Sequence, residues 1–344
     1  MSRRTVTNMA DRASVPIAFP ALAEELMQPA DTLILMHRNP DGDAIGSAFA
    51  LREALQAFGS RAYCICESEI PKRLRFLSDP FQQHVTVGSV PFDIANARVI
   101  AVDVASPSQL GGLAEPFAHR TDLMIDHHAS GTPFAARCYV DGSAAAAGEI
   151  VFDLIRNWEA GGLIPRNPDT NRLLYAAISS DTGCFRFSNV TAGTHTRAAE
   201  LVDSGIDCAA INHLLFESKS MEQLRAEAMG IGKLRVFHGG RVAVIAVSEA
   251  ERQEAGLAES DLETLIDVAR SLAGTEVAVT IRQQSEAPKY RVSLRSSGSY
   301  DVAALCAEFG GGGHVKAAGC TIFAPSPEAA VELIVSSIRF SDEI

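Results

Sequence analysis

Long apolar runs and paired cysteines are scarce in this 344-residue sequence. No stretch approaches the roughly 20 apolar residues that cross a bilayer, so we expect neither a membrane span nor a membrane partner. Polar residues 5–14 separate the first arginines from the next apolar stretch, which is not typical of a signal peptide. The seven cysteines are scattered, and the close pair Cys64 and Cys66 points to opposite faces of an expected strand. The sequence therefore predicts a cytoplasmic protein without a disulfide framework.

Positive charge is also in short supply. The chain has 30 Lys and Arg against 42 Asp and Glu, which gives a net charge of -12. Proteins that hold long nucleic acids need a basic track that displaces counterions from many phosphates. This balance excludes long duplexes as partners and favours a short or monomeric phosphate ligand. Carboxylates that bind metal ions would be neutralised, so the net charge overstates the repulsion at such a site.

The remaining composition is that of a globular protein, with 47% hydrophobic residues and a length that suggests two domains. Strand-like and helix-like runs alternate in the first half of the chain, which predicts an α/β domain with a doubly wound, mainly parallel sheet. Strands are expected at residues 31–36, 61–66, 98–104 and 122–125, and helices at residues 44–58, 144–158 and 171–179.

The second half of the chain predicts a smaller α/β domain with a mixed sheet. Helices are expected at residues 221–233, 261–272 and 327–338, and strands at residues 241–247, 276–283 and 289–295, the last two paired. The expected domains are residues 21–190 and 221–344, joined by a polar helical linker at 191–220. The 20 residues before Ala21 have no assignable role.

Side chains of the metal-binding type stand at the ends of four apolar runs. Because the carboxyl ends of parallel strands meet at one edge of a sheet, such residues can converge although they are far apart in the sequence. Carboxylate oxygens with a few imidazole nitrogens suit manganese, magnesium or iron. Two divalent metals and hydrolytic chemistry are the natural interpretation. The residues are His37, Asp41, Asp43, Asp103, His127 and Asp181.

Each of these residues also has an ordinary explanation. The Pro-Asp-Gly-Asp stretch at 40–43 is equally typical of a turn, and Asp181 of the turn that ends a helix. Asp103 could be a capping residue, although a charge directly after the apolar residues 99–102 is costly without a partner. Adjacent histidines at 127 and 128 are uncommon in a protein core. The four positions together favour a metal site.

Four consecutive glycines suggest an anion-binding loop in the second domain. Glycines let backbone N–H groups approach an anion closely, and nearby side chains can add directed donors. A flexible hinge is the alternative for such a run. Lys316 could be an ordinary solvated lysine, whereas Arg186 and Asn189 could reach the substrate from the first domain. The candidate substrate-binding residues are Arg295, Ser296, Gly311, Gly312, Gly313 and His314.

Taken in order, these motifs resemble the DHH phosphoesterase superfamily, whose name describes Asp126-His127-His128. The first motif of that family resembles His37 through Ser47, and its isolated acids resemble Asp103 and Asp181. The stretch 310–319 resembles the glycine-rich signature of the DHH-associated substrate domain. The resemblance covers nearly the whole chain.

The resemblance implies two Mn²⁺ ions, with Mg²⁺ or Co²⁺ as substitutes. It assigns His37, Asp41 and Asp103 to one ion and Asp43, Asp103, His127 and Asp181 to the other. Ions about 3.5 to 4 Å apart can share a water, lower its pKa and offset charge on phosphoryl oxygens. Asp103 and His128 are then the expected catalytic residues, His128 holding a phosphoryl oxygen or protonating the leaving group. Asp126 is expected to orient a neighbouring side chain.

Within the superfamily, the length and the domain pair are similar to the oligoribonuclease and phosphoadenosine-phosphate phosphatase group. This similarity implies hydrolysis of short oligoribonucleotides or linear dinucleotides such as pApA and pGpG to mononucleotides, and action on 3′-phosphoadenosine 5′-phosphate. Two alternatives stay open: a cyclic-dinucleotide phosphodiesterase, and a nucleotide sensor without turnover. Apolar helix faces would serve a domain core or a homodimer equally well.

Overall fold

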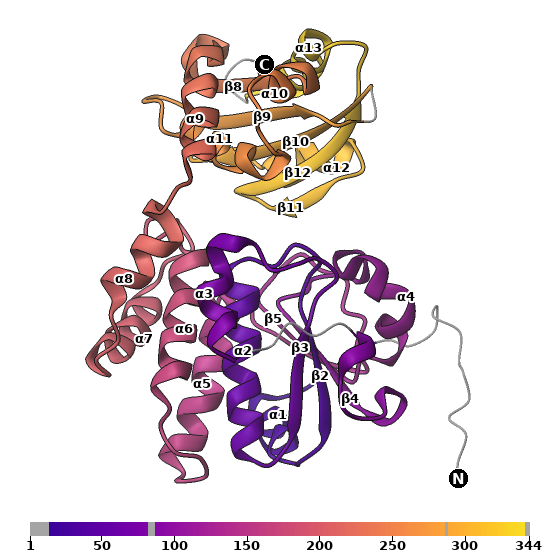
Figure 1. The fold of residues 1–344 in the computed structure, drawn as a ribbon, viewed down its shortest axis with the longest axis vertical. Helices are drawn as coiled ribbons and strands as arrows, with labels where there is room; N and C mark the ends of the chain where they lie inside the picture. The colour runs from indigo at the N-terminus through magenta and orange to yellow at the C-terminus, as the bar shows by residue number, and fades with distance from the viewer. Residues whose placement is uncertain (1–13, 82–86, 286–287, 341–344) are drawn as a thin grey trace. The chain divides into compact units, whose positions relative to one another are not determined.

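The structure is a computed structural model that describes residues 14–81, 87–285 and 288–340. The chain divides into two compact units, unit 1 and unit 2, between Ser218 and Lys219 (Figure 1). Among the described residues, no helix has the length and apolar character needed to cross a membrane.

Unit 1 contains a six-stranded parallel sheet in the order β1-β6-β5-β4-β2-β3. From β2 the chain moves outward to β3, and it then returns to the other side of β2 to form β4, β5 and β6 in turn. The doubly wound sheet expected from the sequence is confirmed, and its switch point lies between β2 and β4. Ligand sites of such sheets lie at that point, outside the carboxyl ends of the strands. The strands are β1 (Val15–Pro16), β2 (Asp31–Leu35), β3 (Arg61–Ile65), β4 (Arg98–Val102), β5 (Leu123–Asp126) and β6 (Arg137–Val140).

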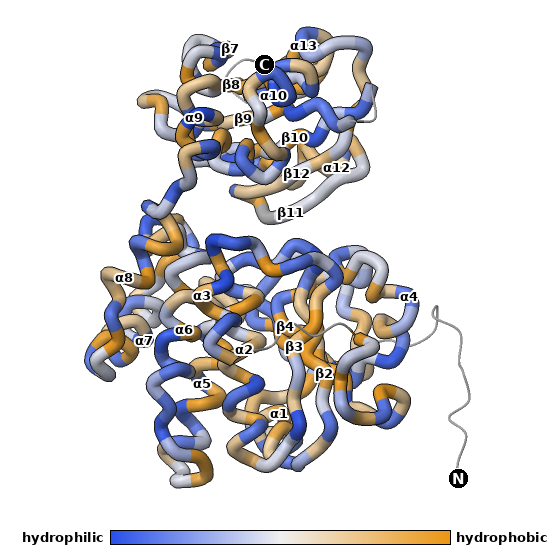
Figure 2. Tube along the Cα trace, in the orientation of Figure 1, coloured by the Kyte–Doolittle hydropathy of each residue, from blue (hydrophilic) through white to orange (hydrophobic). Residues whose placement is uncertain are grey.

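Both faces of this sheet are buried, which explains why its central strands are apolar throughout (Figure 2). Alternate residues such as Ile34 and Ile100 pack with the long helices on one face. Their neighbours Leu33 and Val99 pack on the other face against short helical turns at 107–120. The long helices on the first face are α1 (Phe19–Leu26), α2 (Gly42–Ala57), α5 (Ala147–Ala160) and α6 (Pro168–Asp181). The short turns are η5 (Pro107–Leu113), α4 (Ala114–Phe117) and η6 (Ala118–Arg120).

Glycines bring three of the long helices close together. A Cβ on Gly46 of α2 would lie 2.5 Å from the carbonyl oxygen of Leu173 in α6. A Cβ on Gly148 of α5 would lie 2.6 Å from the Cβ of Ala177 in α6. Since real Cβ atoms do not approach so closely, both positions need glycine. This packing brings the start of α2, the start of α5 and the end of α6 to one edge of unit 1.

The expected linker at 191–220 is largely helical and packs within unit 1. Arg197 of α7 (Ala192–Asp203) forms a bidentate ion pair with Asp153 of α5, with N–O distances of 2.9 and 2.6 Å. Asn212, at the end of α8 (Cys208–Asn212), accepts a hydrogen bond from Ser179 of α6 at 2.6 Å. A π-helical turn (His213–Glu217) follows before the boundary to unit 2. The remaining short helices of unit 1 are η1 (Lys72–Leu74), α3 (Arg75–Ser78), η2 (Asp79–Phe81), η3 (Val87–Ser89) and η4 (Ile94–Asn96).

Unit 2 contains the predicted mixed sheet, with the strand order β11-β12-β10-β9-β8-β7. Strands β8 and β9 are parallel, and the other neighbours are antiparallel. The strands are β7 (Arg235–Phe237), β8 (Val242–Val247), β9 (Val277–Gln283), β10 (Lys289–Ser296), β11 (Gly312–His314) and β12 (Ala317–Phe323). The helices are α9 (Met221–Lys233), η8 (His238–Gly240), α10 (Glu249–Glu254), η9 (Glu259–Thr264), α11 (Leu265–Arg270), α12 (Val302–Glu308) and α13 (Pro327–Ser337).

The structure contains elements that the sequence did not predict, among them strands β1, β7 and β12 and helices α1 and α12. The glycine run was expected as a loop, but its second half forms the edge strand β11, because it pairs with β12. The helix expected at 261–272 divides into the 3-10 turn η9 and the short helix α11. Strand β6 was not predicted, since it has four residues, of which Cys138 alone is buried.

Candidate metal centre

The first group of ligand-type side chains lies at the switch point of the sheet. His37 and Asp41 belong to the loop from β2 to α2, and Asp103 directly follows β4. The Nε2 atom of His37 lies 3.8 Å from Oδ1 of Asp41 and 3.6 Å from Oδ2 of Asp103. One donor atom from each residue falls within 4.8 Å of the others, a spacing that could hold one cation.

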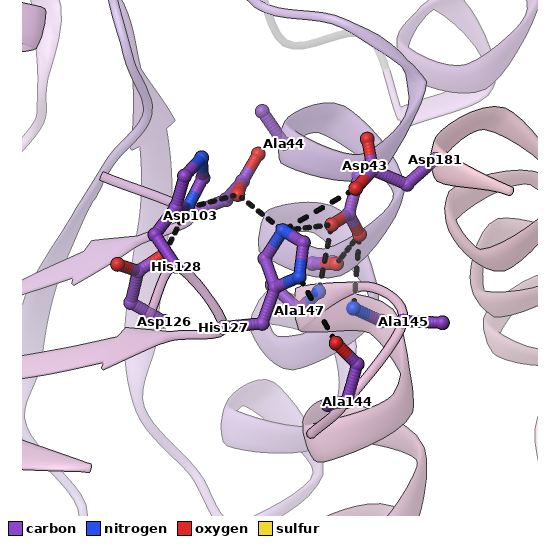
Figure 3. Close-up of polar contacts among 12 residues, drawn as sticks. Asp43, Ala44, Asp103, Asp126, His127, His128, Ala144, Ala145, Ala147 and Asp181 are labelled. Carbon is purple, nitrogen blue, oxygen red and sulfur yellow. Dashed lines mark hydrogen bonds and ion pairs between the residues drawn. The ribbon is translucent and has the colours of Figure 1, made fainter. Parts of the chain in front are cut away.

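A second group contains Asp43, His127 and Asp181, again with donor atoms within 4.8 Å of one another. The Nε2 atom of His127 lies 3.8 Å from Oδ2 of Asp43 and 3.3 Å from Oδ2 of Asp181 (Figure 3). It also lies 3.6 Å from Oδ1 of Asp103. Asp103 therefore presents one carboxylate oxygen to His37 in the first group and the other to His127 in the second.

Asp103 occupies an environment that a cation would relieve. The residue is 3% exposed, and its Oδ1 is buried and accepts no hydrogen bond from any described residue. Burial, together with the nearby carboxylates of Asp43, Asp41 and Asp181, raises the pKa of Asp103 well above its ordinary value. Its backbone is left-handed, with φ of 58°, which is uncommon outside glycine. A buried carboxylate oxygen without a donor fits a metal ligand.

Backbone amides hold Asp43 in place. Ala147 N–H donates to its Oδ2 at 2.7 Å, and Gly148 N–H donates to its Oδ1 at 2.9 Å. The Ser47 hydroxyl donates to Oδ1 at 2.7 Å. Burial nevertheless raises the pKa of Asp43, against the opposing effect of the His127 ring. The carboxylate is thus fixed by the first turn of α5 and oriented toward the second group.

Asp41 is held differently, as the residue that caps α2. Its Oδ1 accepts hydrogen bonds from the backbone N–H groups of Asp43 and Ala44, both at 3.0 Å. Burial raises the pKa of Asp41, but the nearby His37 ring and these two amides lower it below its ordinary value overall. Asp41 is therefore disposed to stay ionised.

The ring of His127 has a defined orientation. Its Nδ1 lies 3.2 Å from the carbonyl oxygen of Ala144, which can only accept a hydrogen bond. With Nδ1 facing this carbonyl, Nε2 is the ring nitrogen that faces the carboxylates of Asp43, Asp103 and Asp181. Metal-binding histidines are commonly oriented by this kind of contact.

His128 is oriented by Asp126 instead. Its Nδ1 lies 2.7 Å from Oδ1 of the fully buried Asp126. Burial lowers the pKa of His128, but this hydrogen bond and the charge of Asp126 raise it overall. Nδ1 also lies 3.7 Å from Asp103, yet its proton is directed at Asp126. Asp126 therefore engages Nδ1 of this ring.

Three polar residues lie at or shortly after the end of α6. Asp181 is the last residue of a helix, whereas the other ligand-type residues follow strands or lie at the start of α2. Arg186 donates from Nε to the carbonyl oxygen of Gly183 at 2.6 Å, and its guanidinium lies over Phe216. Asn189 donates to two backbone carbonyls, a contact that the sequence did not indicate.

The candidate substrate-binding residues lie on β10 and on or directly before β11, the two strands that flank β12. Ala317 of β12 pairs with Arg295 of β10 on one side and with His314 of β11 on the other. The side chain of His314 lies outside the described part of the chain. Ser296 is 6% exposed, and its hydroxyl lies 3.5 Å from the carbonyl oxygen of Gly298, which also accepts from Lys316.

The three glycines differ in what surrounds them. A Cβ on Gly311 would lie 2.3 Å from the carbonyl oxygen of Gly319, and one on Gly313 would lie 2.5 Å from that of Ala317. At Gly312, nothing in the described chain lies within 4 Å of the Cβ position. Gly311 and Gly313 are therefore required by packing on β12, whereas Gly312 offers open backbone.

The fold and the site define a two-unit α/β protein with a centre of carboxylates and histidines at the switch point of its parallel sheet. The description "DHH family, N-terminal domain" matches residues 31–178, and "DHHA1 domain" matches residues 239–339. A bifunctional oligoribonuclease and PAP phosphatase NrnA of Thermus thermophilus is 33% identical over 89% of this chain and 88% of that protein. The chain therefore belongs to the DHH family.

Two further comparisons agree with this assignment. The protein of the same name from Bacillus subtilis is 26% identical over 85% of this chain and 90% of its own length. The crystal structure of an exopolyphosphatase-related protein from Bacteroides fragilis has a TM-score of 0.83. It is 22% identical and covers 92% of this chain and 95% of its own, which shows that the fold is shared.

Proposed function

We propose that this protein is a metal-dependent phosphodiesterase that hydrolyses short oligoribonucleotides and linear dinucleotides to nucleoside monophosphates. The same site would act as a phosphatase on 3′-phosphoadenosine 5′-phosphate. The observation that carries the proposal is the position of Asp103, whose two oxygens face two separate groups of ligand-type side chains. The names of the Thermus and Bacillus relatives support the substrate class.

Two cations, Mn²⁺ by preference and Mg²⁺ or Co²⁺ as substitutes, would occupy the two groups. His37, Asp41 and Asp103 would hold one, and Asp43, His127 and Asp181, again with Asp103, the other. When bound, such a pair lowers the pKa of a water and offsets the charge that develops on phosphoryl oxygens. The buried carboxylates around Asp103 repel one another, and the positive charge of two cations would offset that repulsion.

His128 would handle the proton or hold the phosphoryl group. Its Nδ1 is directed at Asp126, so Nε2 would meet a phosphoryl or leaving-group oxygen. The raised pKa of His128, caused by the Asp126 hydrogen bond, favours the charged ring that either role needs. Asp126 would orient this ring and favour its charged form.

Unit 2 would bind the nucleotide end of the substrate. Arg295, Ser296 and His314 would supply directed donors, and the backbone of Gly311, Gly312 and Gly313 would lie against a phosphate. The exposed edge strand β11, with open space at Gly312, is compatible with such an approach. A net charge of -12 supports short substrates over long nucleic acids.

A reducing compartment, the cytoplasm, is the location we propose. All seven cysteines lie in the described chain, and none forms a disulfide. Stable extracellular domains more often use such bonds.

A matched substrate panel tests the function. Purified protein with Mn²⁺ is given pApA, pGpG, a five-residue RNA, 3′-phosphoadenosine 5′-phosphate, pyrophosphate and a cyclic dinucleotide. We expect mononucleotide from both dinucleotides and the RNA, loss of that activity in Asp103→Asn, and little action on pyrophosphate. Activity confined to the phosphoadenosine compound would reduce the proposal to a phosphatase. Preference for the cyclic compound would favour a cyclic-dinucleotide phosphodiesterase, and binding without any product would favour a sensor.

A further inference from the structure

One short backbone segment, residues 144–148, holds two of the three side chains in the second group (Figure 3). The carbonyl of Ala144 fixes the ring of His127, and the amides of Ala147 and Gly148 fix the carboxylate of Asp43. We name these residues the ligand-holding segment. Any shift of this segment would move both side chains together.

Asn189 fastens this segment to the third member of the group. Its Nδ2 donates to the carbonyl oxygen of Ala145 at 2.9 Å and to that of Asp181 at 3.1 Å. An amide nitrogen has two protons, so both of its donors are used. The acceptors lie on the ligand-holding segment and on the residue whose carboxylate is 3.3 Å from His127.

The surroundings of Ala145 make this contact difficult to replace. Ala145 is 1% exposed, so water has little access to its carbonyl. Its N–H donates to the buried Glu149 at 3.3 Å, which fixes the other side of the same residue. Without Asn189, the carbonyl would be left buried and unpaired, a condition that folded proteins avoid by local rearrangement.

We propose that Asn189 is a positioning residue that sets the relative placement of Asp43, His127 and Asp181, and that its loss weakens one cation selectively. The inference rests on the two-cation site of the proposed function. Asn189 is not a catalytic residue, because its contacts are backbone carbonyls. His37 and Asp41 lie in a separate loop, where the amides of α2 hold Asp41, so the first group keeps its own support.

Asn212 offers a matched control. It is a half-buried asparagine of the same unit that also bridges two elements, donating to the Tyr175 hydroxyl at 3.0 Å and accepting from Ser179 at 2.6 Å. Neither partner is a ligand-type residue or part of the ligand-holding segment. Removal of either asparagine costs hydrogen bonds between elements, but of the two only Asn189 contacts the ligand-holding segment and the backbone of Asp181.

The experiment titrates metal-free full-length protein with Mn²⁺, using calorimetry and the spin-resonance signal of unbound Mn²⁺. Wild type and Asn212→Ala should bind two ions with similar affinities. Asn189→Ala should keep one affinity and lose about 10- to 100-fold in the other, the usual effect of residues that orient metal ligands. Hydrogen exchange of metal-free protein should be faster across residues 144–148 in Asn189→Ala than in Asn212→Ala.

Each other outcome has a defined meaning. If wild type does not bind two ions, the two-cation site of the proposed function is wrong. If wild type binds two ions and Asn189→Ala behaves like Asn212→Ala, or loses both affinities equally, the positioning role is overturned. If the alanine variant fails to fold, Asn189→Leu replaces it, because leucine has a similar size and no hydrogen-bond donor. The same Mn²⁺ affinities are then compared with those of Asn212→Ala. Failure of both variants, with Asn212→Ala folded, would assign Asn189 to general stability and overturn the inference.

Discussion

The two units place their candidate functional residues in opposite ways. In unit 1 they are charged side chains at the carboxyl edge of a parallel sheet, and Asp43, Asp103 and His127 are buried. In unit 2 Arg295 and Ser296 lie on the interior strand β10, whereas the glycines at 311–313 lie at the exposed edge strand β11, where the absence of side chains shapes the surface. Unit 1 is built to concentrate negative charge, and unit 2 is built to leave backbone accessible.

This difference shows what each unit can tolerate. Buried carboxylates depend on exact partners, such as the amides that hold Asp43, and on a cation that balances their charge. The exposed glycines at 311–313 depend instead on the absence of side chains that would fill the space beside them. Changes of charge should therefore act mainly through metal binding and turnover, whereas changes of shape at β11 should act through substrate affinity and the stability of unit 2.

The largest effect is expected from Asp103→Asn, which removes a negative charge that faces both groups. Turnover should fall by about 10³-fold or more, because the loss of a single group that stabilises developing charge already costs on the order of 10²- to 10³-fold. Product release from pApA with Mn²⁺ measures it. Asp122→Asn is the control, since Asp122 accepts from Val99 N–H at the opposite end of β5. Normal turnover in Asp103→Asn would contradict the two-cation site.

The next largest effect should come from His128→Gln. We expect kcat to fall by about 10²- to 10⁴-fold, the usual contribution of a positioned proton donor. Mn²⁺ binding should remain at two ions, because the proposed function assigns His128 to the substrate rather than to either cation. Calorimetric titration beside the rate measurement checks both points. A variant that lost one ion would show that His128 is a metal ligand rather than a proton donor.

A change in unit 2 should instead alter KM. His314→Ala should raise KM for pApA by about 10-fold, the size expected for one hydrogen bond to a charged group. Mn²⁺ stoichiometry and the kcat of saturated enzyme should stay near wild type. Steady-state kinetics over a wide substrate range separates the two constants. Loss of Mn²⁺ in this variant would contradict the division of roles between the units, because a residue of unit 2 would then contribute to metal binding as well as to substrate affinity.

The smallest effect separates two adjacent glycines. Gly311→Ala should lower the free energy of unfolding of unit 2 by about 1 to 3 kcal/mol, because overpacking costs that much and its Cβ would collide with Gly319. Gly312→Ala should change stability by less than about 0.5 kcal/mol while raising KM. Urea unfolding measures the first quantity and kinetics the second. Equal stability of the two variants would mean that β11 does not pack as described.

The sequence predicted the parts of the fold that depend on periodicity. The apolar runs around Leu33 and Val99 are strands because they pack on both faces, and the helix after Leu33 begins and ends within two residues of the prediction. The short helical turns at 107–120, which follow Val99, were not predicted. The glycine run was placed in a loop because glycine disfavours strands. Its pairing with β12 is a tertiary effect that no local pattern reveals.

The candidate site was predictable only in part, for a similar reason. Residues that follow strands, such as His37 and Asp103, carry a positional signal in the sequence. The contributions of Ala144 and Ala147 come from their backbones, so their side chains leave no trace of the role. Asn189 was suggested as a substrate contact, and nothing in the sequence indicated that its amide nitrogen donates to two carbonyls that only the folded chain brings together.

The left-handed backbone of Asp103 also restricts which inactive relatives of this protein could arise by single changes. Asp and Asn tolerate that conformation better than most residues that bear a side chain, and glycine tolerates it freely. A change to Asn or Gly would give a folded protein without the charge, whereas a change to Glu would keep the charge at the cost of strain at the end of β4. A mutational route toward a protein that binds nucleotides without cutting them would therefore start at Asn, while Glu would not preserve activity.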